Sequence, residues 1–148
     1  MRFGHLTWPE ARDIDKDKIV ILPLGSCEQH GPHMPLLTDT LIVTALAEAV
    51  EQDMTNDILL LPSLWTGMSD HHLQLSGTVT LNPELYTRTL VRTLSTIADH
   101  GFRKIFLLNG HGGNHGPLRE ALPGWRKELG ITLDADSYWS GIPRDKML

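Results

Sequence analysis

The sequence predicts an α/β layered fold with a largely parallel sheet. Short apolar runs of strand length alternate along the chain with longer amphipathic segments of helix length. Each apolar run is continuous rather than alternating, which is typical of strands that are buried on both faces of a parallel sheet. With 148 residues, 41% of them hydrophobic, the chain is long enough to bury the core of one domain.

The first strand and helix follow from the N-terminal third of the chain. The apolar run at 18–25 predicts a buried strand, and Pro23 removes one amide donor, which favours a bulge or a sheet edge there. Residues 39–52 have the apolar spacing of a helix. Asp39 or Thr40 is expected to cap the N-terminus of that helix.

The middle of the chain predicts two further strands and the clearest helix. Short apolar runs at 57–63 and 103–110 have the length and composition of buried strands. Between them, residues 82–101 form a helical pattern that Asn82 is expected to cap. A proline suits the first helical position and Gly101 suits the C-terminal stop.

The last elements are a helix and a strand. Residues 116–130 predict a helix that is interrupted or kinked at Pro123 and closed by Gly130. Residues 131–139 predict a fourth strand. The alternation of strand and helix is therefore maintained over the whole chain.

The loops that follow the first three strands carry the unusual polar clusters, at 28–39, 65–76 and 109–115. In parallel α/β sheets, ligands bind beyond the carboxyl ends of the strands. We therefore expect these three loops to meet at one edge of the sheet and to form the functional site there.

Composition excludes several classes of protein. A net charge of −5 and scattered basic residues give no surface for nucleic acid or an anionic membrane. The single cysteine, Cys27, excludes a disulfide framework and is expected to be buried and inert. The N-terminus lacks the apolar core of a signal peptide, and no apolar run reaches membrane-spanning length. A cytoplasmic protein is expected.

The first loop contains a set of metal-ligand residue types. Glu28 and His30 lie two apart, so in an extended segment they point to the same side, and Asp39 can reach them if the loop folds back. This nitrogen and oxygen set suits Zn, Mn or Fe better than copper or calcium. The competing interpretation is an acidic helix cap followed by solvated loop residues.

The third loop, NGHGGNHG, follows a strand and is rich in glycine. His111 at the strand tip is a candidate ligand, and Asn109 or Asn114 is placed to orient it or to donate to a substrate. A glycine-rich cradle for phosphate is the alternative, although the loop matches neither common nucleotide-binding pattern. A tight turn would explain the glycines but not the histidine.

The second loop gives a weaker signal. Ser69 and His72 are candidates to line a pocket, although a structured loop explains them equally. Trp65 is either a pocket wall or part of the core. Tyr138 and Trp139 end the fourth strand at the same edge, where core packing is the favoured interpretation.

Taken together, three segments resemble the creatininase (creatinine amidohydrolase) family: GSCEQHGPHMPLLTDT, GMSDHHLQLSGT and LLNGHGGN. The resemblance implies a three-layer α/β/α subunit with a mostly parallel sheet that assembles into homo-oligomers. It also implies a metal-dependent amidohydrolase that acts on a small-molecule amide, such as a cyclic amide, a formamide or a related non-peptide C–N bond.

The resemblance also implies roles for individual residues. Two divalent cations per subunit, Zn or Mn with Fe as a further option, would activate a shared hydroxide, and Asp39 would bridge them. The implied metal ligands are Glu28, His30, Asp39 and His111. The candidates for substrate binding are Ser69, His72, Gly112, Gly113 and Asn114.

Three departures from the family pattern are visible. Creatininase proper has a glutamate ligand where this chain has Gly113, and a bulky aromatic residue where it has Gly112. A later H-A-G-E-x-E-T-S-like segment, which carries catalytic groups in the family, is absent, so no catalytic residue is assigned. Residues 1–148 are expected to form a single creatininase-like domain without that segment. The alternative function is a truncated or degenerate member that keeps a partial metal site without turnover.

Overall fold

A parallel sheet forms the centre of the computed structural model, which describes residues 1–142. In that part of the chain the sheet has four strands in the order β2-β1-β3-β4, and every neighbouring pair is parallel. The strands are β1 (Ile19–Leu24), β2 (Ile58–Leu60), β3 (Lys104–Asn109) and β4 (Thr132–Ser137). The predicted α/β fold with a parallel sheet is confirmed.

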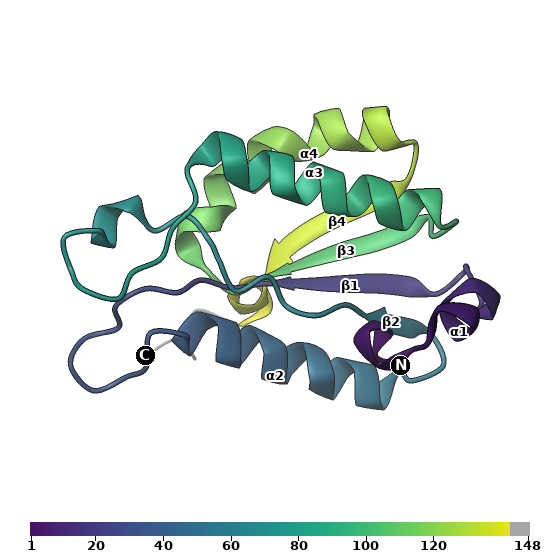
Figure 1. Ribbon diagram of the computed structural model, residues 1–148, viewed down its shortest axis with the longest axis horizontal. Helices are drawn as coiled ribbons and strands as arrows, with labels where there is room; N and C mark the ends of the chain where they lie inside the picture. The colour runs from purple at the N-terminus through teal and green to yellow at the C-terminus, as the bar shows by residue number, and fades with distance from the viewer. Residues whose placement is uncertain (143–148) are drawn as a thin grey trace.

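Helices cover the sheet on both faces, which gives three layers (Figure 1). The helices α3 (Pro83–Asp99) and α4 (His115–Leu129) lie side by side on one face, and α2 (Thr38–Asp53) lies on the other. A short helix, α1 (Trp8–Asp13), precedes β1 and was not expected from the sequence. Four 3₁₀ turns complete the described elements: η1 (Phe3–His5), η2 (Asp70–His72), η3 (Gly112–Asn114) and η4 (Tyr138–Gly141).

The main hydrophobic core lies between the sheet and the pair α3 and α4. It is built from alternate residues of the strands, such as Val20 and Leu107, and from Tyr86, Leu90 and Leu94 of α3. Under α2 a smaller apolar cluster contains Ile21, Ala47, Ile58 and Leu60. Burial on both faces explains why β1 and β2 appear in the sequence as continuous apolar runs.

The proline in β1 occupies a position where no strand needs its missing amide. β2 pairs only with Ile19, Val20 and Ile21, so it ends before Pro23 is reached. On that side the carbonyl of Pro23 accepts a hydrogen bond from the amide of Leu64, at 2.9 Å. β1 is a central strand, but its regular pairing with β2 has ended at Pro23. The proline therefore stands where the ladder is interrupted, as the sequence predicted.

The helix ends agree with the sequence in α3 and differ in α2. Asn82 caps α3 by accepting a hydrogen bond from the amide of Leu85 at 2.8 Å, as predicted. α2 begins at Thr38 after Leu37, so the prediction that Asp39 or Thr40 is the N-cap was wrong. The reason is that the Asp39 carboxylate is used by the site described below.

The last helix was predicted to be interrupted or kinked at Pro123, and the structure shows that it is not interrupted. α4 continues from His115 to Leu129 with Pro123 inside it and ends at Gly130, whose φ is 59°. Pro123 and Arg119 are both exposed. The carbonyl that loses its helical partner at Arg119 is therefore on the solvent side, where water can replace the missing amide.

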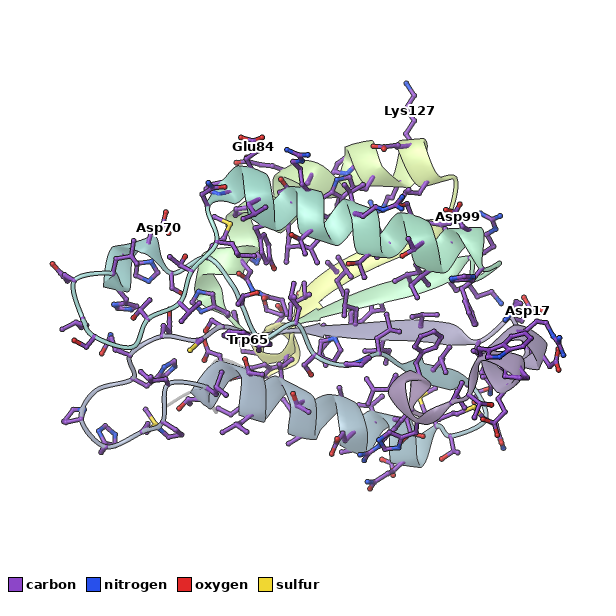
Figure 2. All side chains as sticks on the ribbon, in the orientation of Figure 1. Asp17, Trp65, Asp70, Glu84, Asp99 and Lys127 are labelled. Carbon is purple, nitrogen blue, oxygen red and sulfur yellow. The ribbon has the colours of Figure 1, made fainter. Side chains whose placement is uncertain are left out.

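The carboxyl ends of the strands meet at the end of the molecule where the long loops gather, on the left in Figure 1. Asp70 lies at this end in Figure 2, whereas Asp17 and Asp99 lie at the opposite end. Isolated bridges join Leu24 to Leu64 and Cys27 to Val79 and thereby tie the loops after β1 and β2 together. Within residues 1–142, no helix has both the length and the apolar character that crossing a membrane requires.

Candidate metal centre

Three of the predicted ligands come together in the loop after β1 and the first turn of α2. One potential ligand atom from each of Glu28, His30 and Asp39 lies within 4.8 Å of the others. The His30 Nε2 atom is 3.1 Å from Asp39 Oδ1. The loop folds back as expected, because the Glu28 amide donates to the carbonyl of Leu36 at 2.9 Å.

The fourth predicted ligand, His111, enters from the end of β3. Its Nδ1 atom is 2.8 Å from Asp39 Oδ2 and 3.5 Å from Glu28 Oε1. Its other ring nitrogen, Nε2, is 3.0 Å from the carbonyl of Met68, where it can donate a hydrogen bond. This contact favours the tautomer that leaves Nδ1 free to face the two carboxylates, which is how proteins orient metal-binding imidazoles.

The electrostatics of the site favour charged groups at its centre. Burial alone would raise the pKa of the Asp39 carboxyl, but hydrogen bonds from His111 and Ser26 outweigh it and hold that pKa below its usual value. Burial alone would lower the pKa of His111, but the hydrogen bonds to Asp39 and Met68 and the charge of Glu28 raise it instead. Without a cation, the folded state therefore favours the charged forms of both Asp39 and His111.

Glu28 provides the test of whether the site fits a metal. Its side chain is only 8% exposed, and its Oε2 atom is buried with no hydrogen-bond partner among residues 1–142. A buried carboxylate oxygen without a partner is costly, so such atoms call for an explanation. A divalent cation held by this nitrogen and oxygen set would supply the missing partner, and Zn and Mn suit the set.

Two asparagines connect the loops of the site through hydrogen bonds. The Asn109 side chain accepts a hydrogen bond from the His111 amide at 3.2 Å and donates one to the His111 carbonyl at 2.9 Å. It therefore orients His111, which is one of the two roles predicted for it. Asn114 accepts from the Met68 amide at 3.1 Å and donates to the Gly25 carbonyl at 3.2 Å. The loops after β1, β2 and β3 are thereby fixed to one another.

Comparison with known proteins agrees with this geometry. A family profile described as "Creatininase: Creatinine amidohydrolase" matches residues 4–146. The chain belongs to the creatininase family. The resemblance to the creatininase family that the sequence motifs indicated is therefore confirmed.

Several relatives of this creatininase-family chain have descriptive names. "Mycofactocin precursor peptide peptidase" of Mycobacterium tuberculosis is 40% identical over 111 residues, covering 70% of this chain and 44% of the relative. "Creatinine amidohydrolase" of Pseudomonas putida is 34% identical over 152 residues, covering 94% and 58%. A solved creatinine amidohydrolase superposes with a TM-score of 0.87 at 29% identity, covering 97% and 60%. The chain thus spans about half of the length of these relatives.

Metals occur in the names of two other solved creatininases. A structure named "Creatininase Mn" has a TM-score of 0.86 at 28% identity and covers 97% of this chain and 60% of its own. A mutant creatininase of "Zn-Zn type" has a TM-score of 0.83 at 31% identity and covers 94% and 58%. Relatives of this chain with the same fold are thus named for Mn or for a pair of Zn ions.

The residues predicted to bind substrate fall into two groups. Ser69 and Asn114 are fully buried and bonded to the protein, so they position neighbours rather than face solvent. His72 is half-buried, with its ring 3.0 Å from the Gln29 side-chain nitrogen. Gly112 is exposed, whereas Gly113 is half-buried. Of the five, His72, Gly112 and Gly113 remain accessible.

The sequence reasoning did not assign roles to Ser26 and His71. The Ser26 hydroxyl donates to Asp39 Oδ2 at 2.9 Å. His71 follows Asp70 in η2, and its ring lies parallel to that of His111 with ring centroids 6.4 Å apart. The adjacent histidines His71 and His72 were the only sequence signal for a group at this place. Their spacing alone could not show that the loop after β2 brings them close to Glu28.

The aromatic residues of this edge are less buried than predicted. Trp65 is 48% exposed, and Tyr138 and Trp139 are half-buried in η4 after β4 has ended. The prediction of core packing for Tyr138 and Trp139 was wrong, because the strand stops at Ser137 and the chain turns away. Burial, with a contribution from the charge of Asp39, raises the pKa of Tyr138.

Proposed function

We propose that this chain provides the metal centre of a metal-dependent amidohydrolase that acts on a small-molecule amide. Two observations carry the proposal: four ligand side chains converge at one edge of the sheet, and one of them has a buried carboxylate oxygen without a partner. These side chains are Glu28, His30, Asp39 and His111. The curated relatives named above point to the same reaction class, because creatinine and a peptide both contain C–N amide bonds.

The proposed cofactor is Zn or Mn, with Fe as a further option, held by these four residues. Asp39 offers one carboxylate oxygen toward His30 and the other toward His111, so it would join the ligands of the first loop to the ligand from β3. When bound, the ions would supply Lewis acidity that activates water and polarises the amide carbonyl.

The chain's own residues prepare this centre before any ligand arrives. The Met68 carbonyl holds the His111 ring, and Ser26 holds one oxygen of Asp39. Because both partners are fixed by the protein, the ligand atoms need little rearrangement to bind a cation. A substrate can approach at Gly112, where a side chain placed on the backbone would meet nothing within 4 Å.

The proposed activity is tested by release of amine or ammonia from creatinine, formamide, small cyclic amides and short peptides. We expect turnover of at least one of these by protein loaded with Zn or Mn, and its loss after chelation and in Glu28→Gln. The matched control is His33→Ala, because His33 is exposed in the same loop and should not affect turnover. Absence of turnover on all four substrate types with bound metal would overturn the hydrolase proposal.

A second candidate function is a family member that binds metal without turnover. Gly113 favours it, because a Cβ there would lie 2.1 Å from the Met68 carbonyl oxygen, so the family's glutamate ligand cannot be accommodated in this backbone. The same assay separates the two candidates: bound metal without turnover identifies the non-catalytic form.

We also propose that the chain forms homo-oligomers through α2. Ile42, Leu46 and Val50 follow one another at four-residue spacing on one side of this helix and are exposed at 39%, 40% and 39%. Glu48 lies on another side of the helix, where it pairs with Arg2 at 3.0 Å. Sedimentation should show an oligomer that Leu46→Glu dissociates, whereas a wild-type monomer would contradict this assignment.

A further inference from the structure

We propose that His71 and His72, together with Glu28, form a second cation position beside the first. It would bind a divalent transition metal such as Zn. The inference deepens the proposed function, because it depends on Glu28 also serving the cluster with His30 and Asp39. It concerns residues to which the family resemblance gave no ligand role.

The geometry brings three ligand types to one point. One potential ligand atom from each of Glu28, His71 and His72 lies within 4.8 Å of the others. η2 makes this possible, because its tight turn places two consecutive imidazoles over the loop after β1. Their ring centroids are 4.2 Å apart and the rings are tilted by 46°, so the two histidines form one compact group.

Glu28 is common to both clusters, and a carboxylate has two oxygens to offer. Its Oε1 atom lies 3.5 Å from His111, on the side of the first cluster. Its Oε2 atom is the one that is buried without a hydrogen-bond partner among residues 1–142. The carboxylate can therefore offer one oxygen to each position, and its unpartnered oxygen indicates that at least one ligand is missing beside Glu28.

Gly113 explains why a second ion would need these histidines. A Cβ at this position would lie 2.1 Å from the Met68 carbonyl oxygen and 2.6 Å from His111 Nε2, so no ligand side chain fits there. The segment that fills this space continues directly from Met68 into His71 and His72. The loop that removes room for one ligand thus brings two others to the site.

The chemistry of the cluster suits a zinc-like ion. Two imidazoles and one carboxylate form a three-ligand set that leaves one position open for water or substrate. His71 is exposed, so an ion can enter from solvent. The ring of His72 already has a nitrogen 3.0 Å from the Gln29 amide nitrogen, and this hydrogen bond would be exchanged for the metal.

The test is zinc stoichiometry, measured by equilibrium dialysis and elemental analysis on the intact chain. The key variant is the double change His71→Ala with His72→Ala, and the second is Asp39→Asn. The matched control changes two exposed histidines away from the site, His5→Ala with His100→Ala. Near-ultraviolet circular dichroism checks folding, and single His71→Gln and His72→Gln variants replace the double variant if it fails to fold.

The expected result is two ions in wild type and in the control, and one ion in the His71 and His72 variant. Two ions retained in that variant would overturn the inference. A single wild-type ion that Asp39→Asn removes and the histidine variant keeps would leave the proposed function standing and refute the second position. A single wild-type ion that the histidine variant loses and Asp39→Asn keeps would support the second position and refute the first. No bound ion in wild type would refute both.

Discussion

The candidate centre has an inner and an outer half, and they are held in different ways. The inner half (Asn109, His111 and Asn114) is buried, and every one of its side chains bonds to other parts of the protein. The outer half (His30, His71) lies on loops and is half-buried or exposed. Core packing therefore presets one side of the site, whereas the other side depends on loops that a cation would draw together.

The largest expected effect comes from Glu28, which lies 3.5 Å from His111 of the inner half and groups with both His30 and His71 of the outer half. Glu28→Gln should weaken zinc binding by more than about 100-fold, because even partners outside the ligand set typically contribute about 10- to 100-fold. The metal-free variant should be as stable as wild type or more stable, because an unpaired buried charge is removed. Titration calorimetry with zinc and thermal unfolding in chelator measure both effects. Wild-type affinity in this variant would exclude Glu28 as a ligand.

Gly113 and Gly112 are a matched pair of neighbouring positions, one packed against the protein and one facing open space. Gly113→Ala should destabilise the metal-free protein by about 1–3 kcal/mol, because the new methyl group collides with Met68 and His111. Gly112→Ala should change stability by less than about 0.5 kcal/mol, because that position faces open space. Urea unfolding curves measure the difference. Equal effects at the two glycines would contradict the described packing of the loop against His111.

Asn114 and His30 separate stability from metal affinity. Asn114→Ala leaves the Met68 amide and the Gly25 carbonyl without this partner and should cost about 1–3 kcal/mol of stability. His30→Ala should change metal-free stability by about 0.5 kcal/mol or less, yet weaken zinc binding more strongly than Asn114→Ala does. The same stability loss in both variants would show that the two halves are equally built into the fold.

The smallest expected effect is the pH dependence of the metal-free protein. The pKa of Asp39 is lowered in the folded state, so its contribution is present above about pH 3.9 and is lost as the pH falls through the lowered value. The pKa of His111 is raised, so its contribution is present below about pH 6.5 and is lost as the pH rises through the raised value.

The ion pair should therefore stabilise the fold most between about pH 3.9 and pH 6.5. The difference in melting temperature between wild type and Asp39→Asn, measured in chelator, should be greatest in this range. A difference that is constant from pH 3 to pH 9 would show that Asp39 and His111 do not interact in the folded protein.

Most of the fold was predictable because local and tertiary signals agree. The strand 103–110 and the helix 82–101 have apolar patterns, caps and stops that the structure retains as β3 and α3. The N-cap of α2 was missed because the sequence offers Asp39 and Thr40 as caps. Their side chains bond instead to Ser26, and neighbouring sequence cannot reveal this partner.

The candidate site was only partly predictable for a similar reason. Glu28, His30 and Asp39 lie close together in the sequence. His111 could be predicted at the same edge because the carboxyl ends of parallel strands lie together. The position of His71 depends on how the loop after β2 packs against the loop after β1, which involves the bridge between Cys27 and Val79. Such contacts between distant segments leave no periodic signal in a single sequence.

The central claim is that Glu28, His30, Asp39 and His111 hold a divalent cation. The most direct measurement is anomalous diffraction at the zinc edge from crystals of the intact chain grown with zinc. We expect an anomalous peak whose distances to nitrogen and oxygen atoms of these four residues are about 2.0–2.2 Å. Crystals that contain zinc elsewhere but show no peak among these four residues would contradict it.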